Sequence, residues 1–294
     1  MFGWREKFTY LECAFCGCLQ IVKVPSDLEK YYGESYYSVA PTNMKRSLFY
    51  SLMKSTRTQA FLEGKGFFGG LLLDKFGPPG LPTWVKHAAV RQDHSILEVG
   101  CGSGALLVSL KSEGFKNLTG LDPFIKSEIN YGQGLKIHKA RICEHRGEYD
   151  FIILEHAFEH IPDPYSTLRD LSGLLSPKGT LIISIPLAGY AWSHYGVDWV
   201  QLDAPRHLYL HTEKSFRMVA KNLTVFDVVF DSGAVQFWGS EQYAKDIPLL
   251  DERSYRVDPD ASIFSLEAIS DFHRKAVELN EKRLGDQATF YLRK

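Results

Sequence analysis

The chain has 294 residues, of which 45% are hydrophobic and 23% charged, so it can bury a full core as one large α/β domain or one domain with appendages. Its formal net charge of -1 gives no general attraction to nucleic acid or to an anionic membrane, which argues against both as partners. No run approaches the roughly 20 apolar residues of a membrane span, and no signal-peptide core opens the chain, so we expect a cytoplasmic protein.

The first part of the chain is expected to be an N-terminal extension, residues 1–64, in front of a domain that covers residues 65–294. Three of the five cysteines, Cys13, Cys16 and Cys18, lie close together in this extension. A structural zinc site needs four ligands, and neither a second cysteine pair nor a nearby histidine supplies the fourth. We therefore expect reduced thiols and no metal site. A helix is expected from about residue 42 to residue 64.

A strand, a glycine turn and a helix are predicted in the stretch LEVGCGSGALLVSL, residues 97–110. Gly100, Gly102 and Gly104 let the backbone adopt positive φ and let a ligand approach closely, while the helix N-terminus offers free N–H groups. The turn therefore predicts a ligand. The glycine turn does not identify the ligand, because GCGSGA also matches the looser G-x-G-x-x-A form of the dinucleotide-binding fingerprint.

Strands and helices alternate through the rest of the chain. Short apolar runs typical of buried parallel strands lie at 117–122, 134–143, 149–154 and 179–185, and a capped helix is expected at 163–175. Two further strands are expected at 222–230 and 286–294, with a helix around 266–279 inserted before the last one. This order predicts a doubly wound, seven-stranded, Rossmann-like α/β sheet.

Four motifs resemble the class I S-adenosylmethionine-dependent methyltransferases, across roughly residues 85–294. They are the glycine turn with an acid two places before its first glycine, GLDP at 120–123, EYDFIILEHAFEHIPDP at 148–164 and SPKGTLIISIP at 176–186. The resemblance implies methyl transfer from S-adenosylmethionine and a last strand that is antiparallel. The loop at 186–212 resembles the W...D.PRHL stretch of a bacterial subset, some of which modify sugars, polysaccharides or other small metabolites. In this subset a zinc ribbon can precede the domain, and the cysteine segment resembles half of one.

The resemblance also implies which residues hold the cofactor. They are Glu98, Gly100, Gly102, Gly104, Asp122, Pro123, Phe124, Glu144 and Glu155. Asp122, after the second strand, would accept both ribose hydroxyls, and Phe124 would wall one side of the adenine. Glu144 stands where the family usually has an aspartate.

Three histidines are candidates for a catalytic base, because a neutral imidazole accepts a proton near pH 7 if the acceptor is a hydroxyl. His207, in the loop after the fifth strand, is the first choice, with Asp203 as a partner that would orient it. His156 and His160 follow, and a structural role, in which a ring N–H fixes the loop, is equally open for His160. The acceptor is expected to be a small molecule, and the sequence does not predict the oligomeric state.

Two other interpretations stay open at this point. A nicotinamide-dependent oxidoreductase is motivated by the G-x-G-x-x-A match, although no catalytic Tyr/Lys pair is recognisable. A non-catalytic cofactor-binding or assembly module is motivated by the incomplete cysteine cluster and the unusual end of the third strand. Cofactor titration distinguishes the oxidoreductase from a methyltransferase. Turnover with a methyl acceptor distinguishes the non-catalytic module from a methyltransferase.

Overall fold

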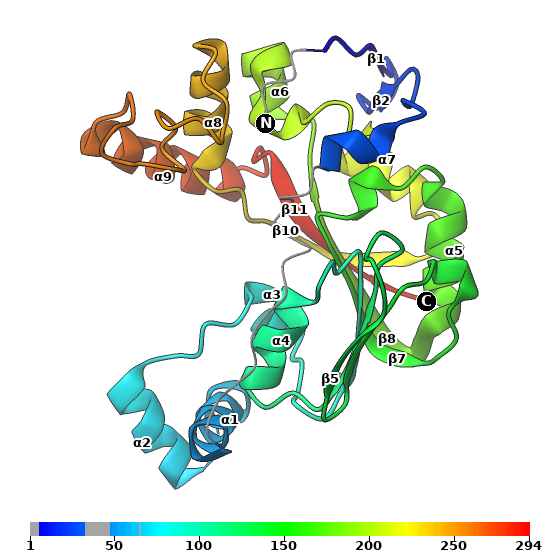
Figure 1. The fold of residues 1–294 in the computed structure, drawn as a ribbon, viewed down its shortest axis with the longest axis vertical. Coiled ribbons are helices and arrows are strands. Elements are labelled where there is room, and N and C mark those ends of the chain that lie inside the picture. The colour runs from blue at the N-terminus through cyan, green and yellow to red at the C-terminus, as the bar shows by residue number, and fades with distance from the viewer. Residues whose placement is uncertain (1–5, 33–47, 65) are drawn as a thin grey trace.

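The computed structural model describes residues 6–32, 48–64 and 66–294, and an eight-stranded sheet lies at its centre. The strands follow the order β10-β11-β8-β7-β3-β4-β6-β5 across this sheet (Figure 1). In chain order they are β3 (Ser95–Val99), β4 (Asn117–Leu121), β5 (Ile129–Gly132), β6 (Leu135–His138), β7 (Tyr149–Glu155), β8 (Leu175–Pro186), β10 (Thr224–Phe230) and β11 (Gln287–Arg293). The predicted doubly wound α/β fold is confirmed, and the last strand, β11, is antiparallel to β8 and to β10.

The sheet has one strand more than the seven expected, because a hairpin extends its edge. Strand β5 pairs antiparallel with β6. Only Gln133 and Gly134 separate the two strands, and both have positive φ, 48° and 84°. Positive φ at both positions of a two-residue loop gives the type I′ twist that suits a hairpin. Asn-Gly and Asp-Gly are the usual sequence signals for this turn, and the Gln-Gly found here is a weaker one.

The third predicted strand is shorter than expected. The sequence predicts this strand at 134–143, but β6 ends at His138. Its partner β4 ends at Leu121, which lies opposite His138 in the parallel ladder. Beyond this point the chain has no strand to pair with, and the segment continues into a short 3₁₀ helix, η3 (Ile142–Glu144).

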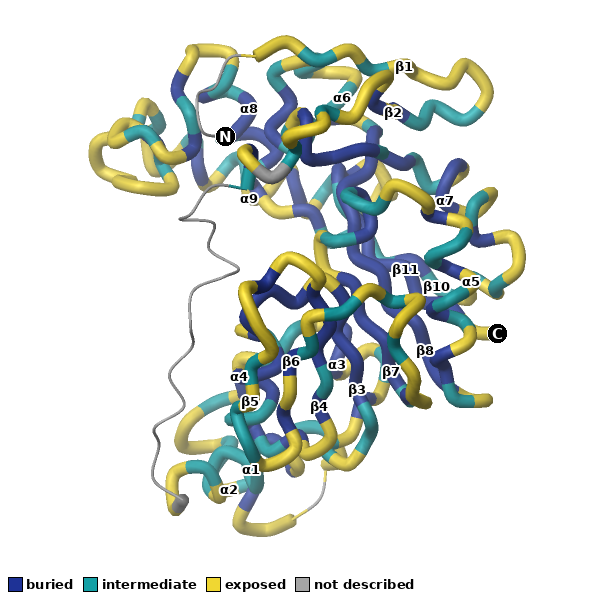
Figure 2. The backbone as a smooth tube through the Cα atoms, turned by 45° about the vertical axis from the view of Figure 1, so that its right-hand side comes forward, coloured by how far each residue is buried: buried dark blue, intermediate teal, exposed yellow. Residues whose placement is uncertain are grey.

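Helices cover both faces of the sheet, as Figure 2 shows around the buried strands. On one face lie α3 (Thr83–His87) and α4 (Ala105–Ser112), and on the other lie α5 (Pro164–Leu174) and α7 (Glu213–Val219). Strand β7 serves both cores, since Phe151 and Ile153 pack on the α3 and α4 side while Ile152 and Leu154 pack on the α5 and α7 side. The alternation follows from the two-residue period of a strand.

The N-terminal extension contacts the rest of the chain through a small second sheet. This is a three-stranded antiparallel sheet in the order β1 (Tyr10–Glu12), β2 (Leu19–Ile21) and β9 (Tyr209–Leu210). Strand β9 lies in the loop after β8. The hydroxyl of Tyr10 donates to the carbonyl of His207 at 2.8 Å. The extension therefore helps to hold the segment that carries the predicted catalytic loop.

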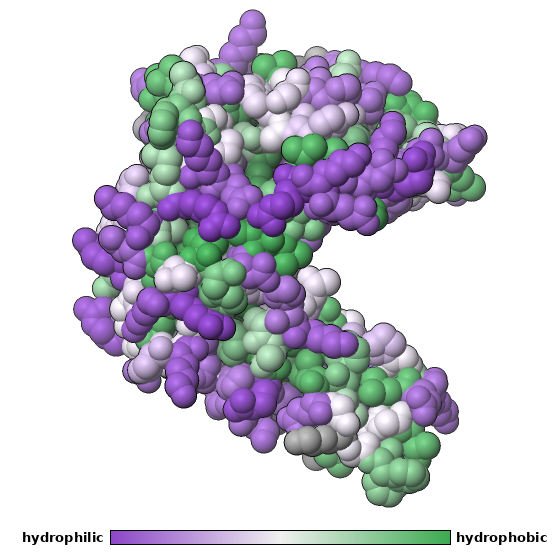
Figure 3. Space-filling view, turned by 180° about the vertical axis from the view of Figure 1, so that it is seen from behind, coloured by the Kyte–Doolittle hydropathy of each residue, from purple (hydrophilic) through white to green (hydrophobic). Residues whose placement is uncertain are grey.

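Helix α1 (Leu48–Glu63) packs against α2 (Phe67–Phe76) and touches α4. Residues 42–47 of the helix expected at 42–64 lie outside the described residues. The domain boundary at residue 64 falls between α1 and α2 and stays a proposal. These helices expose apolar side chains at one end of the molecule, seen as green at the lower right of Figure 3. The exposed side chains include Phe49, Leu52, Phe67, Phe68 and Leu71.

Three more helices, α6 (Tyr190–Tyr195), α8 (Val235–Ala244) and α9 (Leu266–Glu281), lie toward the opposite end of the molecule (Figure 1). Helix α9 is the expected insertion before the last strand, and α8 adds to it. Within the described ranges, no helix combines the length and the apolar character needed to cross a membrane.

Candidate active site

The glycine turn connects the end of β3 to the start of α4. Gly100, Gly102 and Gly104 have φ of 75°, 54° and 82°, a region that side chains other than glycine rarely adopt. A Cβ atom on Gly100 would lie 2.7 Å from Ala157 Cβ, and one on Gly104 would lie 2.6 Å from Ile137 Cδ1. The neighbouring side chains thus leave no room for a Cβ at Gly100 and Gly104, which explains why both positions are glycine.

Replacing Gly104 with alanine should lower the free energy of unfolding by about 1–2 kcal/mol, the usual cost of a left-handed conformation with a Cβ. A urea titration measures this. The matched control is Gly70→Ala in helix α2, where a Cβ meets nothing within 4 Å and φ is not positive. The control should be neutral or stabilising by up to about 1 kcal/mol, because alanine favours helix. Equal losses in the two variants would contradict the strain argument.

Asp122 lies directly after β4 and connects the end of that strand to the glycine turn after β3. It is 8% exposed, and its Oδ2 accepts the N–H of Gly102 while its Oδ1 accepts the N–H of Phe124, both at 2.8 Å. Each carboxylate oxygen has two lone pairs, so each can accept one further hydrogen bond. A ribose diol offers two hydroxyl donors of this kind, and the observed geometry leaves Asp122 able to receive them.

Glu98 is buried beneath the same turn, near the end of β3. Burial raises the pKa of its carboxyl group well above the usual value, and the nearby charges of Glu155 and Asp122 act in the same direction. Its Oε2 accepts no hydrogen bond within the described part of the chain. An unused buried oxygen of this type is suited to a donor on a ligand.

The predicted adenine walls differ from each other in the structure. Phe124 is 73% exposed, and its ring lies nearly parallel to that of Tyr32, with 6.1 Å between centroids. Tyr32 ends η1 (Leu28–Tyr32) of the extension, so the extension reaches the predicted cofactor site. Pro123 is exposed beside it. Glu144 is also exposed, but its carboxylate accepts the N–H of Arg141 at 2.9 Å, which gives it a local role in the turn.

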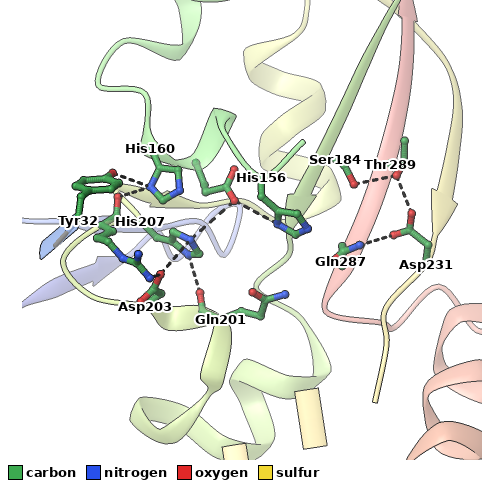
Figure 4. Close-up of polar contacts among 12 residues, drawn as sticks. Tyr32, His156, His160, Ser184, Gln201, Asp203, His207, Asp231, Gln287 and Thr289 are labelled. Carbon is green, nitrogen blue, oxygen red and sulfur yellow. Dashed lines mark hydrogen bonds and ion pairs between the residues drawn. The ribbon is translucent and has the colours of Figure 1, made fainter. Parts of the chain in front are cut away.

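The three predicted histidines lie close to one carboxylate, that of Glu159, which is 1% exposed. Figure 4 shows the three rings. Glu159 Oε1 lies 3.5 Å from His156 Nδ1 and 3.9 Å from His207 Nε2. His160 completes the group, and its ring centroid lies 4.8 Å from that of His207. Asp203 Oδ2 is 3.7 Å from His207 Nε2 and also pairs with Arg206.

Sequence reasoning missed Glu159 and Tyr32 as members of the site. Glu159 directly precedes His160 in EHIPDP, but its role depends on His207, which is 48 positions along the chain and reaches it only because Leu208 N–H donates to the carbonyl of Glu159 at 2.9 Å. That hydrogen bond ties the loop after β8 to η4 (Phe158–His160). No local pattern signals such a contact.

Hydrogen bonds determine the tautomers of the buried ring of His207 and the half-buried ring of His160. His207 Nδ1 lies 2.7 Å from the carbonyl of Gln201, and His160 Nδ1 lies 2.8 Å from the carbonyl of Arg206. A carbonyl oxygen only accepts, so each Nδ1 carries the proton, and Nε2 of each neutral ring has a free lone pair.

The histidines differ in burial, and with it in pKa and in access to solvent. Burial lowers the pKa of His207 to about 4. Burial alone would raise the pKa of Glu159, but contact with His156 and the neighbouring His160 and His207 lower it to about 2. The side chain of His156 is 39% exposed, whereas that of His207 is 7% exposed. His156 is therefore the most exposed of the three rings and the one that a molecule in solution reaches most readily.

A second polar group lies at the ends of β8 and β11, next to His156 (Figure 4). The N–H of His156 donates to the carbonyl of Ser184 at 3.0 Å. Thr289 Oγ1 donates to Asp231 Oδ2 at 2.8 Å and lies 3.0 Å from Ser184 Oγ, while Gln287 Nε2 donates to Asp231 Oδ1 at 3.0 Å. These hydrogen bonds tie the ends of β8 and β11 to Asp231 beside His156.

All five cysteines are free thiols. The N–H of Cys13 donates to the carbonyl of Cys18 at 2.9 Å, which closes a tight turn. The one group of three metal-type ligands in the described ranges consists of Glu159, His160 and His207, and no cysteine belongs to it. The zinc-ribbon likeness of this segment stays an interpretation.

Comparisons with known proteins match the same part of the chain. A family model described as a methyltransferase domain matches residues 73–223. The ubiquinone biosynthesis O-methyltransferase of Aromatoleum aromaticum is 27% identical over 137 residues, which are 42% of this chain and 58% of that protein. The protein of the same name from Escherichia fergusonii is 33% identical over 125 residues, 38% of this chain and 51% of that protein.

The chain therefore spans about half the length of the curated relatives it matches. Among solved structures, Haemonchus contortus phosphoethanolamine N-methyltransferase 2 in complex with S-adenosyl-L-methionine is 15% identical, with a TM-score of 0.45. The match covers 94% of this chain and 61% of that chain.

Proposed function

Because this chain belongs to the methyltransferase-domain family, we propose that it transfers the methyl group of S-adenosylmethionine to a small-molecule acceptor. The observation that carries the proposal is the placement of the glycine turn, Asp122 and His156 at the carboxyl ends of β3, β4 and β7. In an open α/β sheet this edge is where ligands bind. The names of the curated relatives favour an oxygen as the atom that is methylated.

Five residues would bind and orient the cofactor: Glu98, Gly100, Gly102, Gly104 and Asp122. The glycines bring backbone N–H groups close to it, and Asp122 accepts the ribose hydroxyls. When bound, S-adenosylmethionine supplies a methyl group on a positively charged sulfur. The protein contributes mainly by placing the acceptor in line with that carbon–sulfur bond.

His156 is the better placed of the three histidines to take the proton of the acceptor. Glu159 lies on its Nδ1 side at 3.5 Å, as an orienting carboxylate does, and Nε2 is then the acceptor atom. If the acceptor is a hydroxyl, His156 Nε2 would take its proton while the bound S-adenosylmethionine would supply the methyl group. His207 is less suited to this step, because its Nε2 points at two carboxylates in a buried position.

Calorimetry with S-adenosylhomocysteine and with NADH tests the proposal. We expect S-adenosylhomocysteine to bind in the micromolar range and NADH to give no heat. The reason is that the glycine turn and the strand ends beside it lie within the residues matched by a methyltransferase-domain model. Tight binding of NADH with no heat from S-adenosylhomocysteine would remove the proposal and leave the oxidoreductase. Binding of S-adenosylhomocysteine without turnover of any phenolic or sugar hydroxyl would favour the non-catalytic module.

A further inference from the structure

Glu159 is a buried carboxylate with an unusual environment. Its closest side-chain partner is His156, whose Nδ1 lies 3.5 Å from Oε1, and no shorter hydrogen bond to either oxygen is found within the described part of the chain, although the residue is 1% exposed. Burying a charged group costs several kcal/mol unless it is well paired and hydrogen-bonded, and a single imidazole at 3.5 Å is a long contact, so a further positive partner is expected at these oxygens. The nearest side chains are imidazoles, which are cationic only when protonated.

The Nε2 atom of His207 faces this carboxylate, and a ring nitrogen of His160 lies near both. His207 and His160 each use Nδ1–H for a backbone carbonyl, which leaves Nε2 of each ring without a proton. Glu159 Oε1 lies 3.9 Å from His207 Nε2 with no hydrogen between them in that tautomer. Several electron-rich atoms that face one another in a buried space repel one another unless a cation lies among them.

The donor atoms have the spacing that a metal ion requires. One ligand atom from each of Glu159, His160 and His207 lies within 4.8 Å of the others. A transition-metal ion that binds nitrogen and oxygen at about 2.0–2.2 Å holds tetrahedral ligands roughly 3.4 Å apart. Since Glu159 Oε1 and His207 Nε2 are 3.9 Å apart, small side-chain rotations close the gap.

The surroundings of the two rings resemble those of metal ligands in general. A ligating histidine usually donates its second ring N–H to a carbonyl or carboxylate, which fixes the tautomer and the orientation of the ring. Gln201 and Arg206 supply such carbonyls at 2.7 and 2.8 Å. Two imidazoles and one carboxylate also form a donor set found in zinc and non-haem iron sites.

We propose that Glu159, His160 and His207 bind a first-row divalent transition-metal ion. The sequence named two of these residues as candidate bases and no residue as a metal ligand. The ion neutralises the buried Glu159 carboxylate and holds the loop after β8 against η4. A carboxylate bound through one oxygen can still accept a hydrogen bond, so the contact between Glu159 and His156 is compatible with it. Asp203 is neutralised separately by Arg206.

Metal titration of the full chain tests this proposal without any methyl acceptor, so its failure is distinct from failure of the proposed activity. The protein is stripped with a chelator and titrated with Zn²⁺ by calorimetry and with Co²⁺ by visible absorption. We expect one ion per chain and a Co²⁺ spectrum of four or five ligands. Mg²⁺ should bind far more weakly, because imidazole nitrogens suit transition metals.

The variants Glu159→Gln and His207→Ala should each weaken Zn²⁺ binding by more than the roughly 10–100-fold that follows loss of an outer hydrogen-bond partner. Two controls should bind like the wild type: His273→Ala, an exposed histidine on α9, and the triple serine variant of Cys13, Cys16 and Cys18. No Zn²⁺ or Co²⁺ binding to the wild type would overturn the proposal, whatever the variants do. Binding that disappears only in the serine variant would overturn it as well and assign the ion to the cysteines.

Discussion

The variant His156→Asn is expected to lower the methyl-transfer rate by roughly 10²–10⁴-fold, the usual contribution of a general base, while cofactor affinity stays nearly unchanged. The ring is half-exposed at the end of β7, and Glu159 lies on its Nδ1 side at 3.5 Å. Asparagine is the appropriate replacement, because His156 has φ of 49° and asparagine tolerates that region better than most residues. The measurement is single-turnover transfer to an acceptor that the wild type methylates.

The control for this prediction is His273→Asn, the same change at an exposed site on α9. It should have the wild-type rate and the wild-type unfolding midpoint. A raised KM with an unchanged kcat in His156→Asn would indicate that the ring binds the acceptor and takes no proton. A wild-type rate with the true acceptor would exclude His156 from the mechanism altogether.

The variant Asp122→Ala is expected to weaken binding of S-adenosylhomocysteine by about 2–4 kcal/mol, which is roughly 30- to 1,000-fold in Kd. Two effects combine, since the variant removes the acceptor of the ribose hydroxyls and also the hydrogen bonds to the N–H groups of Gly102 and Phe124. Calorimetry measures the loss. Asp122→Asn, which retains one carbonyl oxygen, should lie between the wild type and the alanine variant.

Asp150→Ala is the matched control for Asp122→Ala. Asp150, in β7, is also a carboxylate that accepts a backbone N–H, that of Ser95 at 2.9 Å, but this contact lies at the amino end of β3, away from the glycine turn. Its loss should lower stability without changing cofactor affinity. If the two variants lose affinity equally, the effect of Asp122 is a general loss of fold and its assignment to the ribose is wrong.

Family membership, the order of strands and helices and the glycine turn could be predicted from the sequence, because each depends on residues close together in the chain. The helix α5 is an example, since Asp163 accepts the N–H of Ser166 as the spacing of cap and first turn predicts. The alternation that divides β7 between two cores is also local. Asp122 follows the same logic, because carboxyl ends of parallel strands share one edge of the sheet.

The histidine cluster and the role of the extension were decided by tertiary structure alone. Tyr32 lies 128 positions before His160, and Tyr10 lies 197 positions before His207, yet each pair is within hydrogen-bond distance. Which histidine is exposed depends on how the loop after β8 packs over η4, a contact that no period in the sequence encodes. Long-range packing thus separated one accessible imidazole, His156, from two that enclose a buried carboxylate, because burial and the neighbouring charges are properties of the assembled fold.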